Sequence, residues 1–133
     1  MKKSTITLFI GLLLGLIGVF GLVGTALAAG MDGCSKVCSS CQTTCEKTRD
    51  YVKSKGGAVA SSTEKQLSDC IDLCRANQAL LKRGSKLHPQ LCKICAQACT
   101  DCAKACEDTH DPKLKDCIEE CKKCAASCTD MSS

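Results

Sequence analysis

The stretch Cys92–Cys106, CKICAQACTDCAKAC, contains five cysteines at steps of three, four, three and four residues. Side chains at this spacing lie on one face of an α-helix, whereas the side chains of a β-strand alternate with a period of two. The stretch therefore predicts a helix with a single stripe of thiols. Mostly polar residues and alanines fill the other positions, so the thiol stripe is expected to face the protein interior.

The same spacing recurs in three other segments of the chain, in one of them in a short form. Their cysteines are Cys34, Cys38, Cys41 and Cys45; Cys70 and Cys74; and Cys117, Cys121, Cys124 and Cys128. Every step within a segment is again three or four residues. Fifteen cysteines in phase with the helical repeat predict four helices whose thiol stripes line a common interior.

Capping residues, glycines and prolines set the expected helix boundaries, at about residues 32–53, 61–83, 89–109 and 111–130. The second helix is expected to begin with a capping box formed by Ser61 and Glu64. Pro89 and Pro112 suit the first turns of the third and fourth helices, and His88 is then expected at a cap. Short connections favour antiparallel neighbours. The predicted fold class is all-α, an antiparallel up-down-up-down four-helix bundle with a cysteine-lined interior.

Composition shows that this interior is not a conventional apolar core. The chain has no Trp and one Tyr, and both Phe residues lie within the first 28 positions. After that point, fifteen cysteines accompany only thirteen Val, Ile and Leu residues. The odd number of cysteines prevents a complete set of intrachain disulfides. A formal charge of +4, with interspersed signs and one aromatic residue beyond the first 28, gives no indication of nucleic-acid binding.

The first 28 residues have the features of a bacterial export signal. Lys2 and Lys3 precede an uncharged apolar run over residues 6–27, and Ala26-Leu27-Ala28 supplies a small-x-small cleavage site. An uncleaved membrane anchor is the alternative, because the run is long enough to span a bilayer. The basic residues before the run predict that the rest of the chain is periplasmic or otherwise extracytoplasmic, through a cleaved Sec-type signal. The expected division is a signal peptide over 1–28 and a metal-binding bundle over 29–133.

Three kinds of chemistry use an interior lined with thiols. Disulfide cross-links suit an exported protein, but each cysteine on a continuous stripe has several possible partners. An iron–sulfur cluster is disfavoured, because ferredoxin-type ligands wrap round a cluster in loops, whereas the Cys92–Cys106 run is helical. The third possibility is a store of soft metal ions, since thiolates select Cu(I) and Zn(II).

Charge balance favours Cu(I) among these ions. Four thiolates around each Zn(II) leave two negative charges per site, and unpaired charge is costly to bury. Cu(I) has one positive charge and tolerates two ligands, so bridging thiolates hold about one ion per sulfur. The sequence predicts a non-enzymatic protein that stores or sequesters multiple Cu(I) ions through its fifteen cysteines. The alternative is a disulfide-stapled exported structural or interaction protein without metal.

The leader and the four cysteine-bearing segments resemble the four-helix-bundle copper storage proteins, and the broader cysteine-rich four-helix-bundle copper-binding proteins of bacteria. The resemblance covers residues 30–129 and rests on the register of the cysteines. It implies a homo-oligomer, commonly a tetramer, whose protomers each hold many Cu(I) ions. Two features depart from the family. The second helix offers only Cys70 and Cys74, and the leader lacks the twin arginine that exported members tend to carry.

The rhythm of three and four residues, continued beyond the last cysteine of a stripe, reaches three more candidate ligands: Met31, His88 and Met131. In an antiparallel bundle all three fall at the same end. Thioethers and neutral imidazole are weaker Cu(I) ligands than thiolate, so these residues are predicted to form a mouth for the ions. At the opposite, closed end the same rhythm places an apolar plug of Val52, Leu67 and Leu114.

Overall fold

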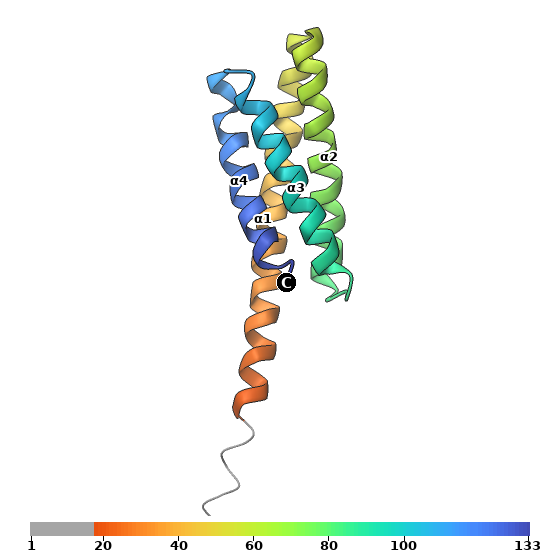
Figure 1. Ribbon diagram of the computed structural model, residues 1–133, viewed down its shortest axis with the longest axis vertical. Helices are drawn as coiled ribbons and strands as arrows, with labels where there is room; N and C mark the ends of the chain where they lie inside the picture. The colour runs from red at the N-terminus through yellow and green to blue at the C-terminus, as the bar shows by residue number, and fades with distance from the viewer. Residues whose placement is uncertain (1–17) are drawn as a thin grey trace, which may run out of the picture.

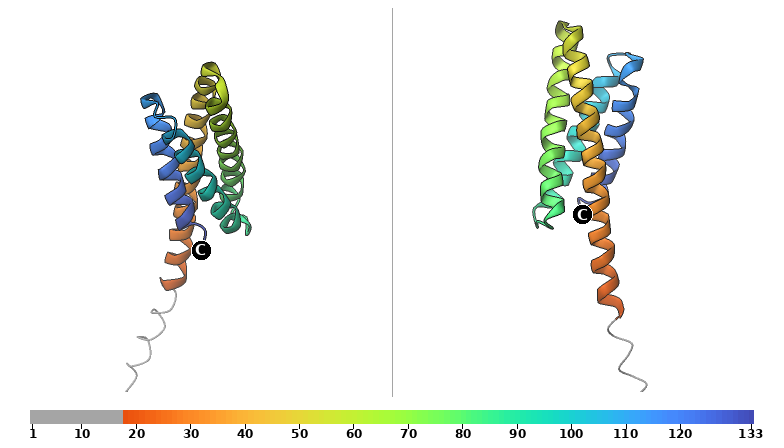
Figure 2. Two further views of the ribbon diagram at one scale, coloured as in Figure 1. Left: turned by 45° about the horizontal axis from the view of Figure 1, so that its top comes forward. Right: turned by 180° about the vertical axis from the view of Figure 1, so that it is seen from behind.

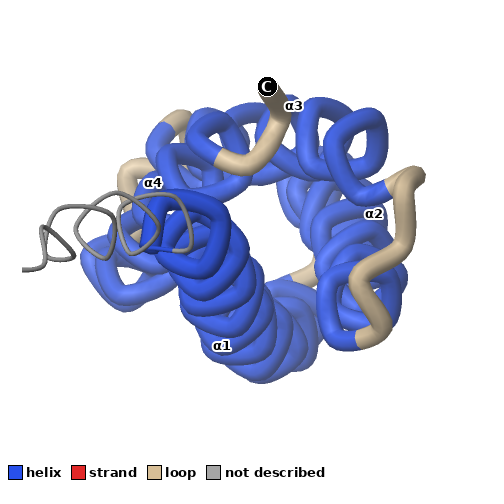
Figure 3. Tube along the Cα trace, turned by 90° about the horizontal axis from the view of Figure 1, so that it is seen from below, coloured by secondary structure: helices blue, strands red, loops and turns tan. Residues whose placement is uncertain are grey.

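The chain forms a bundle of four helices around one interior. The computed structural model describes residues 18–133. Its elements are α1 (Gly18–Lys55), α2 (Gly57–Lys82), α3 (His88–Glu107), the 3-10 turn η1 (Pro112–Leu114) and α4 (Lys115–Asp130), and this part of the chain contains no strand. Each helix packs against the next, and α4 returns to α1 (Figure 1). The predicted all-α, up-down-up-down bundle is confirmed, and Figure 3 shows the four helices surrounding a common axis.

The connection between α1 and α2 is far shorter than predicted. Gly56 alone separates the two helices. Gly56 and Gly57 have φ values of 69° and 91°, in the left-handed region that favours glycine. The two glycines therefore reverse the chain without a loop. The capping box predicted at Ser61 and Glu64 is wrong, because Ser61 lies inside α2 and the helix begins without a side-chain cap.

Helix α1 also begins earlier than predicted, at Gly18 instead of near Asp32. No proline or charged residue interrupts the chain between these positions, so the helix continues through the predicted cleavage site at residues 26–28. Its first turns project beyond the end of the bundle, as both views in Figure 2 show. Within residues 18–133, no helix combines the length and the apolar character needed to cross a membrane. The rest of the predicted leader lies outside the described residues.

Helix α2 ends at Lys82, and Gly84 stops it as the sequence predicts. The N–H of Gly84 donates to the carbonyl of Leu81 at 3.1 Å, and the N–H of Ser85 donates to the carbonyl of Leu80 at 3.0 Å. With Gly84 at φ 60°, these bonds form a Schellman motif that satisfies the last carbonyls of the helix. The connection to α3 is consequently short and well defined.

The starts of the last two helices differ from the prediction in detail. His88 is the first residue of α3, not its cap, and Pro89 lies in the first turn. Asp111 is the expected cap of the final segment, because its Oδ1 accepts a hydrogen bond from the N–H of Lys113 at 3.0 Å. The segment first makes the 3-10 turn η1 and becomes α-helical only at Lys115.

The closed end of the bundle contains the few large apolar residues of the core. Val52, Leu67 and Leu114 are all buried, as expected for the apolar plug. Beside them, the hydroxyl of Tyr51 donates a 2.7 Å hydrogen bond to Asp111, which ties α1 to the segment before α4. This hydrogen bond is the main reason that the pKa of Asp111 lies below its usual value. The opposite end has no comparable aromatic contact among the described residues.

Candidate metal centre

All fifteen cysteines point into the bundle, and none is more than 1% exposed. Twelve of them have an Sγ atom within 3.6–4.0 Å of another cysteine Sγ, and most of these contacts join different helices. These distances are contacts between free thiols, because a disulfide bond would bring two sulfurs to about 2.05 Å. The interior is therefore a column of thiols, as the stripes predict.

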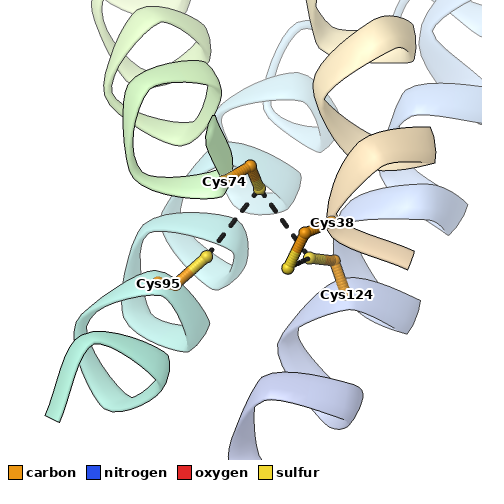
Figure 4. A group of neighbouring side chains, drawn as sticks. All are labelled: Cys38, Cys74, Cys95 and Cys124. Carbon is orange, nitrogen blue, oxygen red and sulfur yellow. Dashed lines mark hydrogen bonds between the residues drawn. The ribbon is translucent and has the colours of Figure 1, made fainter. Parts of the chain in front are cut away.

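One cross-section of the column shows how the helices build a site. Cys38 of α1, Cys74 of α2, Cys95 of α3 and Cys124 of α4 converge on one point (Figure 4). The Sγ of Cys74 lies 3.8 Å from the Sγ of both Cys95 and Cys124, and Cys124 lies 3.7 Å from Cys38. Each helix contributes one thiol, and four thiols at this spacing form a site suited to a soft metal ion.

Such groups of thiols follow one another along the axis and share members. In the described part of the chain, five groups have sulfurs within 4.8 Å of one another: Cys38, Cys74, Cys95 and Cys124; Cys41, Cys45, Cys70 and Cys121; Cys41, Cys70, Cys74 and Cys99; Cys45, Cys102, Cys117 and Cys121; and Cys34, Cys38 and Cys128. Six cysteines belong to two groups each: Cys38, Cys41, Cys45, Cys70, Cys74 and Cys121. The column is therefore continuous and is not a set of separate sites.

Asn77 also belongs to this column, although it is not among the ligands predicted from the sequence. Its side chain is fully buried. Its Nδ2 donates to the sulfurs of Cys38 and Cys128, both at 3.5 Å, and its Oδ1 accepts from the thiol of Cys92 at 3.3 Å. Asn77 follows Cys74 by three residues, so it continues the stripe of α2 at a position where the other helices have cysteine. The spacing alone identifies Asn77 as a member of the stripe, although its side chain is an amide and not a thiol.

A polar seam holds α1 and α2 in register beside the thiols. The amide of Gln78 donates to Gln42 at 2.8 Å, and the amide of Gln42 donates to Glu46 at 2.9 Å. Arg75 completes the seam with a 3.2 Å contact to Glu46. These bonds satisfy polar groups in a helix interface that has few apolar side chains. They fix the positions of the cysteines of α1 along the bundle axis relative to those of α2.

The structure places the three predicted mouth residues at one end of the column. Cys34 and Cys128 lie 3.9 Å apart, which brings the adjoining turns of α1 and α4 together. A Cβ atom on Gly30 would lie 3.4 Å from the Sδ of Met131, so this thioether lies against the turn that carries Met31. Both methionines are half-buried and pack against the core.

His88 lies at the same end, in the first turn of α3. The side chain is half-buried, and its Nδ1 is a buried atom without a hydrogen-bond partner in the described structure. A buried imidazole nitrogen without a partner is unusual, because such groups are normally hydrogen-bonded or bound to a metal. The chemistry of this donor set, thioether and imidazole next to thiols, fits a soft metal ion.

Two thiols next to the mouth, Cys34 and Cys92, have pKa values above the ordinary value of a thiol, which favours their protonated form at neutral pH. Burial raises the pKa of Cys92, and its hydrogen bond to Asn77 opposes this rise only in part. The hydrogen bond with Cys128 lowers the pKa of Cys34, but the interaction with Cys38 and burial outweigh it and raise the pKa to about 12. A metal ion that binds here must therefore displace protons.

Comparison with known proteins connects this architecture to one family. The family model described as copper storage protein matches residues 25–133. Among solved structures, the chain is similar to the Nmul_A1745 protein from Nitrosospira multiformis, with a TM-score of 0.72 and 25% sequence identity over 78% of this chain and 95% of that one. No curated protein matches the chain.

Proposed function

The chain belongs to the copper storage protein family, and we propose that it stores or sequesters many Cu(I) ions through the thiolates of its fifteen cysteines. The observation that carries this proposal is the sharing of sulfurs between successive thiol groups. A bridging thiolate serves two ions at once, which suits an ion of single charge and low coordination number. No enzymatic activity is proposed.

Electrostatics supports Cu(I) as the cargo. Among residues 18–133, no buried cationic side chain lies near the thiols to balance several thiolates. Each Cu(I) that replaces one thiol proton leaves the charge of the column unchanged, whereas four thiolates around each Zn(II) would leave two uncompensated charges in every site. The column can therefore fill from end to end only with a monovalent soft ion.

The free thiols also favour metal over disulfide stapling. Cys45, for example, has sulfur neighbours at 3.6 Å in Cys121, at 3.7 Å in Cys117 and at 3.9 Å in Cys70. With several partners at nearly equal distance, no single disulfide pairing is specified. We further propose that the protein is exported by a Sec-type signal cleaved after Ala28, and that it assembles as a homo-oligomer, as the family resemblance implies.

Replacing one cysteine in the middle of the column tests whether binding is distributed. Cys99→Ser should lower the Cu(I) capacity of the reduced protein by about one ion, because each bridging sulfur accounts for about one metal. Titration with Cu(I) under anaerobic conditions measures the capacity. Thr100→Ser, the exposed neighbour on the same helix, is the control and should leave the capacity unchanged. Loss of several ions together would contradict shared sulfurs and indicate discrete sites.

Replacing the mouth residues tests the path of the ions. The triple change Met31→Leu, His88→Ala and Met131→Leu should slow both Cu(I) loading and removal by a strong chelator, while capacity stays almost unchanged. The reason is that these weaker ligands pass ions to the thiols without retaining them. Stopped-flow measurement of both rates is the readout. Leu87→Ala, next to His88 but without a ligand atom, is the control, and equal rates in the triple variant and the parent would rule out this path.

A further inference from the structure

The charges at the mouth end of the bundle are one-sided. Residues 73–100 contain five basic residues and no acidic one, although the chain has 14 acidic residues. Lys82, Arg83 and Lys86 of this stretch lie at the end of α2 and in the connection to α3, and all three are exposed. None of them forms a salt bridge in the described part of the chain.

Few negative charges at this end oppose the three cations. Asp32 is engaged by Lys36 at 2.7 Å, which leaves Asp130 near the end of α4. The three cations therefore present a net positive surface toward the solvent beyond the mouth. Unpaired, exposed cations of one sign attract an anionic partner and do not stabilise the fold.

An apolar side chain accompanies these cations. Leu87 directly follows Lys86 in the connection between α2 and α3 and is 60% exposed. The mouth end thus combines unpaired cations with an exposed leucine, two features of surfaces that bind anionic lipid.

We propose that the mouth end docks on an anionic lipid surface through the basic end patch, defined as Lys82, Arg83, Lys86 and Leu87. Each basic residue near such a surface strengthens binding about fivefold, so three together contribute on the order of a hundredfold. An acidic protein would satisfy the same charges, but it would not account for the exposed side chain of Leu87 beside them. The patch contains no thiol and no mouth ligand, so the proposal is independent of copper binding.

Vesicle binding by the full chain tests this proposal. The partition coefficient is measured on vesicles of phosphatidylcholine alone and on vesicles that also contain phosphatidylglycerol. The readout is the ratio of the coefficient on the anionic vesicles to the coefficient on the neutral vesicles. Parent and variants are identical over residues 1–46, so the comparison of their ratios isolates the substituted charges. The test variant is Lys82→Gln, Arg83→Gln and Lys86→Gln. The control variant loses the same number of positive charges, but near the closed end of the bundle. Its substitutions are Lys47→Gln, Lys65→Gln and Lys113→Gln.

The ratio should fall on the order of a hundredfold in the test variant and little in the control, and 0.5 M salt should abolish the difference by screening. Circular dichroism and Cu(I) capacity should be the same in all three proteins. An equal fall in both variants would mean that binding depends only on the net charge of the protein, and it would contradict a role for the basic end patch. An unchanged ratio would also overturn it, and loss of binding to poly-L-glutamate in the test variant alone would then assign the patch to an acidic protein.

Discussion

Loading the reduced protein with Cu(I) is expected to raise its melting temperature by about 20 °C or more. An ion that binds only the folded state at a thousand times its Kd adds about 4 kcal/mol of stability, and 1 kcal/mol shifts the melting temperature of a domain this size by roughly 4–8 °C. One well-held ion is enough for the predicted shift, and the column offers room for many. The empty protein is expected to have low stability, because its core consists mainly of thiols.

Calorimetry of the anaerobic protein, before and after stoichiometric loading, measures this shift. A strong Cu(I) chelator should return the loaded sample to the melting temperature of the empty protein, which separates metal binding from irreversible oxidation of the thiols. An unchanged melting temperature after stoichiometric uptake would mean that the ions bind outside the folded core, and it would refute the proposed store.

Truncation of the apolar plug is expected to be the most damaging single change to the empty protein. Leu67 is completely buried at the closed end, and Leu67→Ala should cost about 2–5 kcal/mol through lost burial and the cavity left behind. Domains of this kind have total stabilities of about 5–15 kcal/mol. The loss is therefore a large share of the stability available without metal.

Val59→Ala is the matched control, because Val59 lies on the same helix but is 63% exposed. This change should alter stability by less than about 0.5 kcal/mol. Urea denaturation of the reduced, metal-free proteins gives both values. If the two variants lost similar stability, the plug would contribute no more than the surface does, and the thiol column alone would have to hold the empty bundle together.

The bundle and its thiol lining could be predicted from the sequence because both depend on periodicity. In a helix, residues three and four apart lie on one face, as do Cys34, Cys38, Cys41 and Cys45. Because the residues between them are mostly polar, this face packs toward the interior. The confirmed fold follows from that constraint on all four helices. The register of the stripes also places Met31, His88 and Met131 at one end, as the structure shows.

Features that depend on local backbone conformation were less predictable. Ser61 and Glu64 have the spacing of a capping box, but the preceding glycines reverse the chain earlier and α2 begins before them. Nothing in the spacing shows that α1 extends back to Gly18, because the cysteine pattern begins only at Cys34. Asn77 is not predicted for another reason: its amide is not a soft-metal ligand, whereas its position in the stripe depends only on register.

The sharing of sulfurs has a consequence for how ions move within the bundle. The group of Cys41, Cys45, Cys70 and Cys121 and the group of Cys41, Cys70, Cys74 and Cys99 have two cysteines in common. In the proposed store, a cuprous ion that passes from one group to the other can keep these two sulfurs while it exchanges the rest, without being released as a free ion. The proposed column is then a one-dimensional conduit as well as a container. We expect ions admitted at the mouth to migrate inward by stepwise ligand exchange, and those nearest the mouth to leave first.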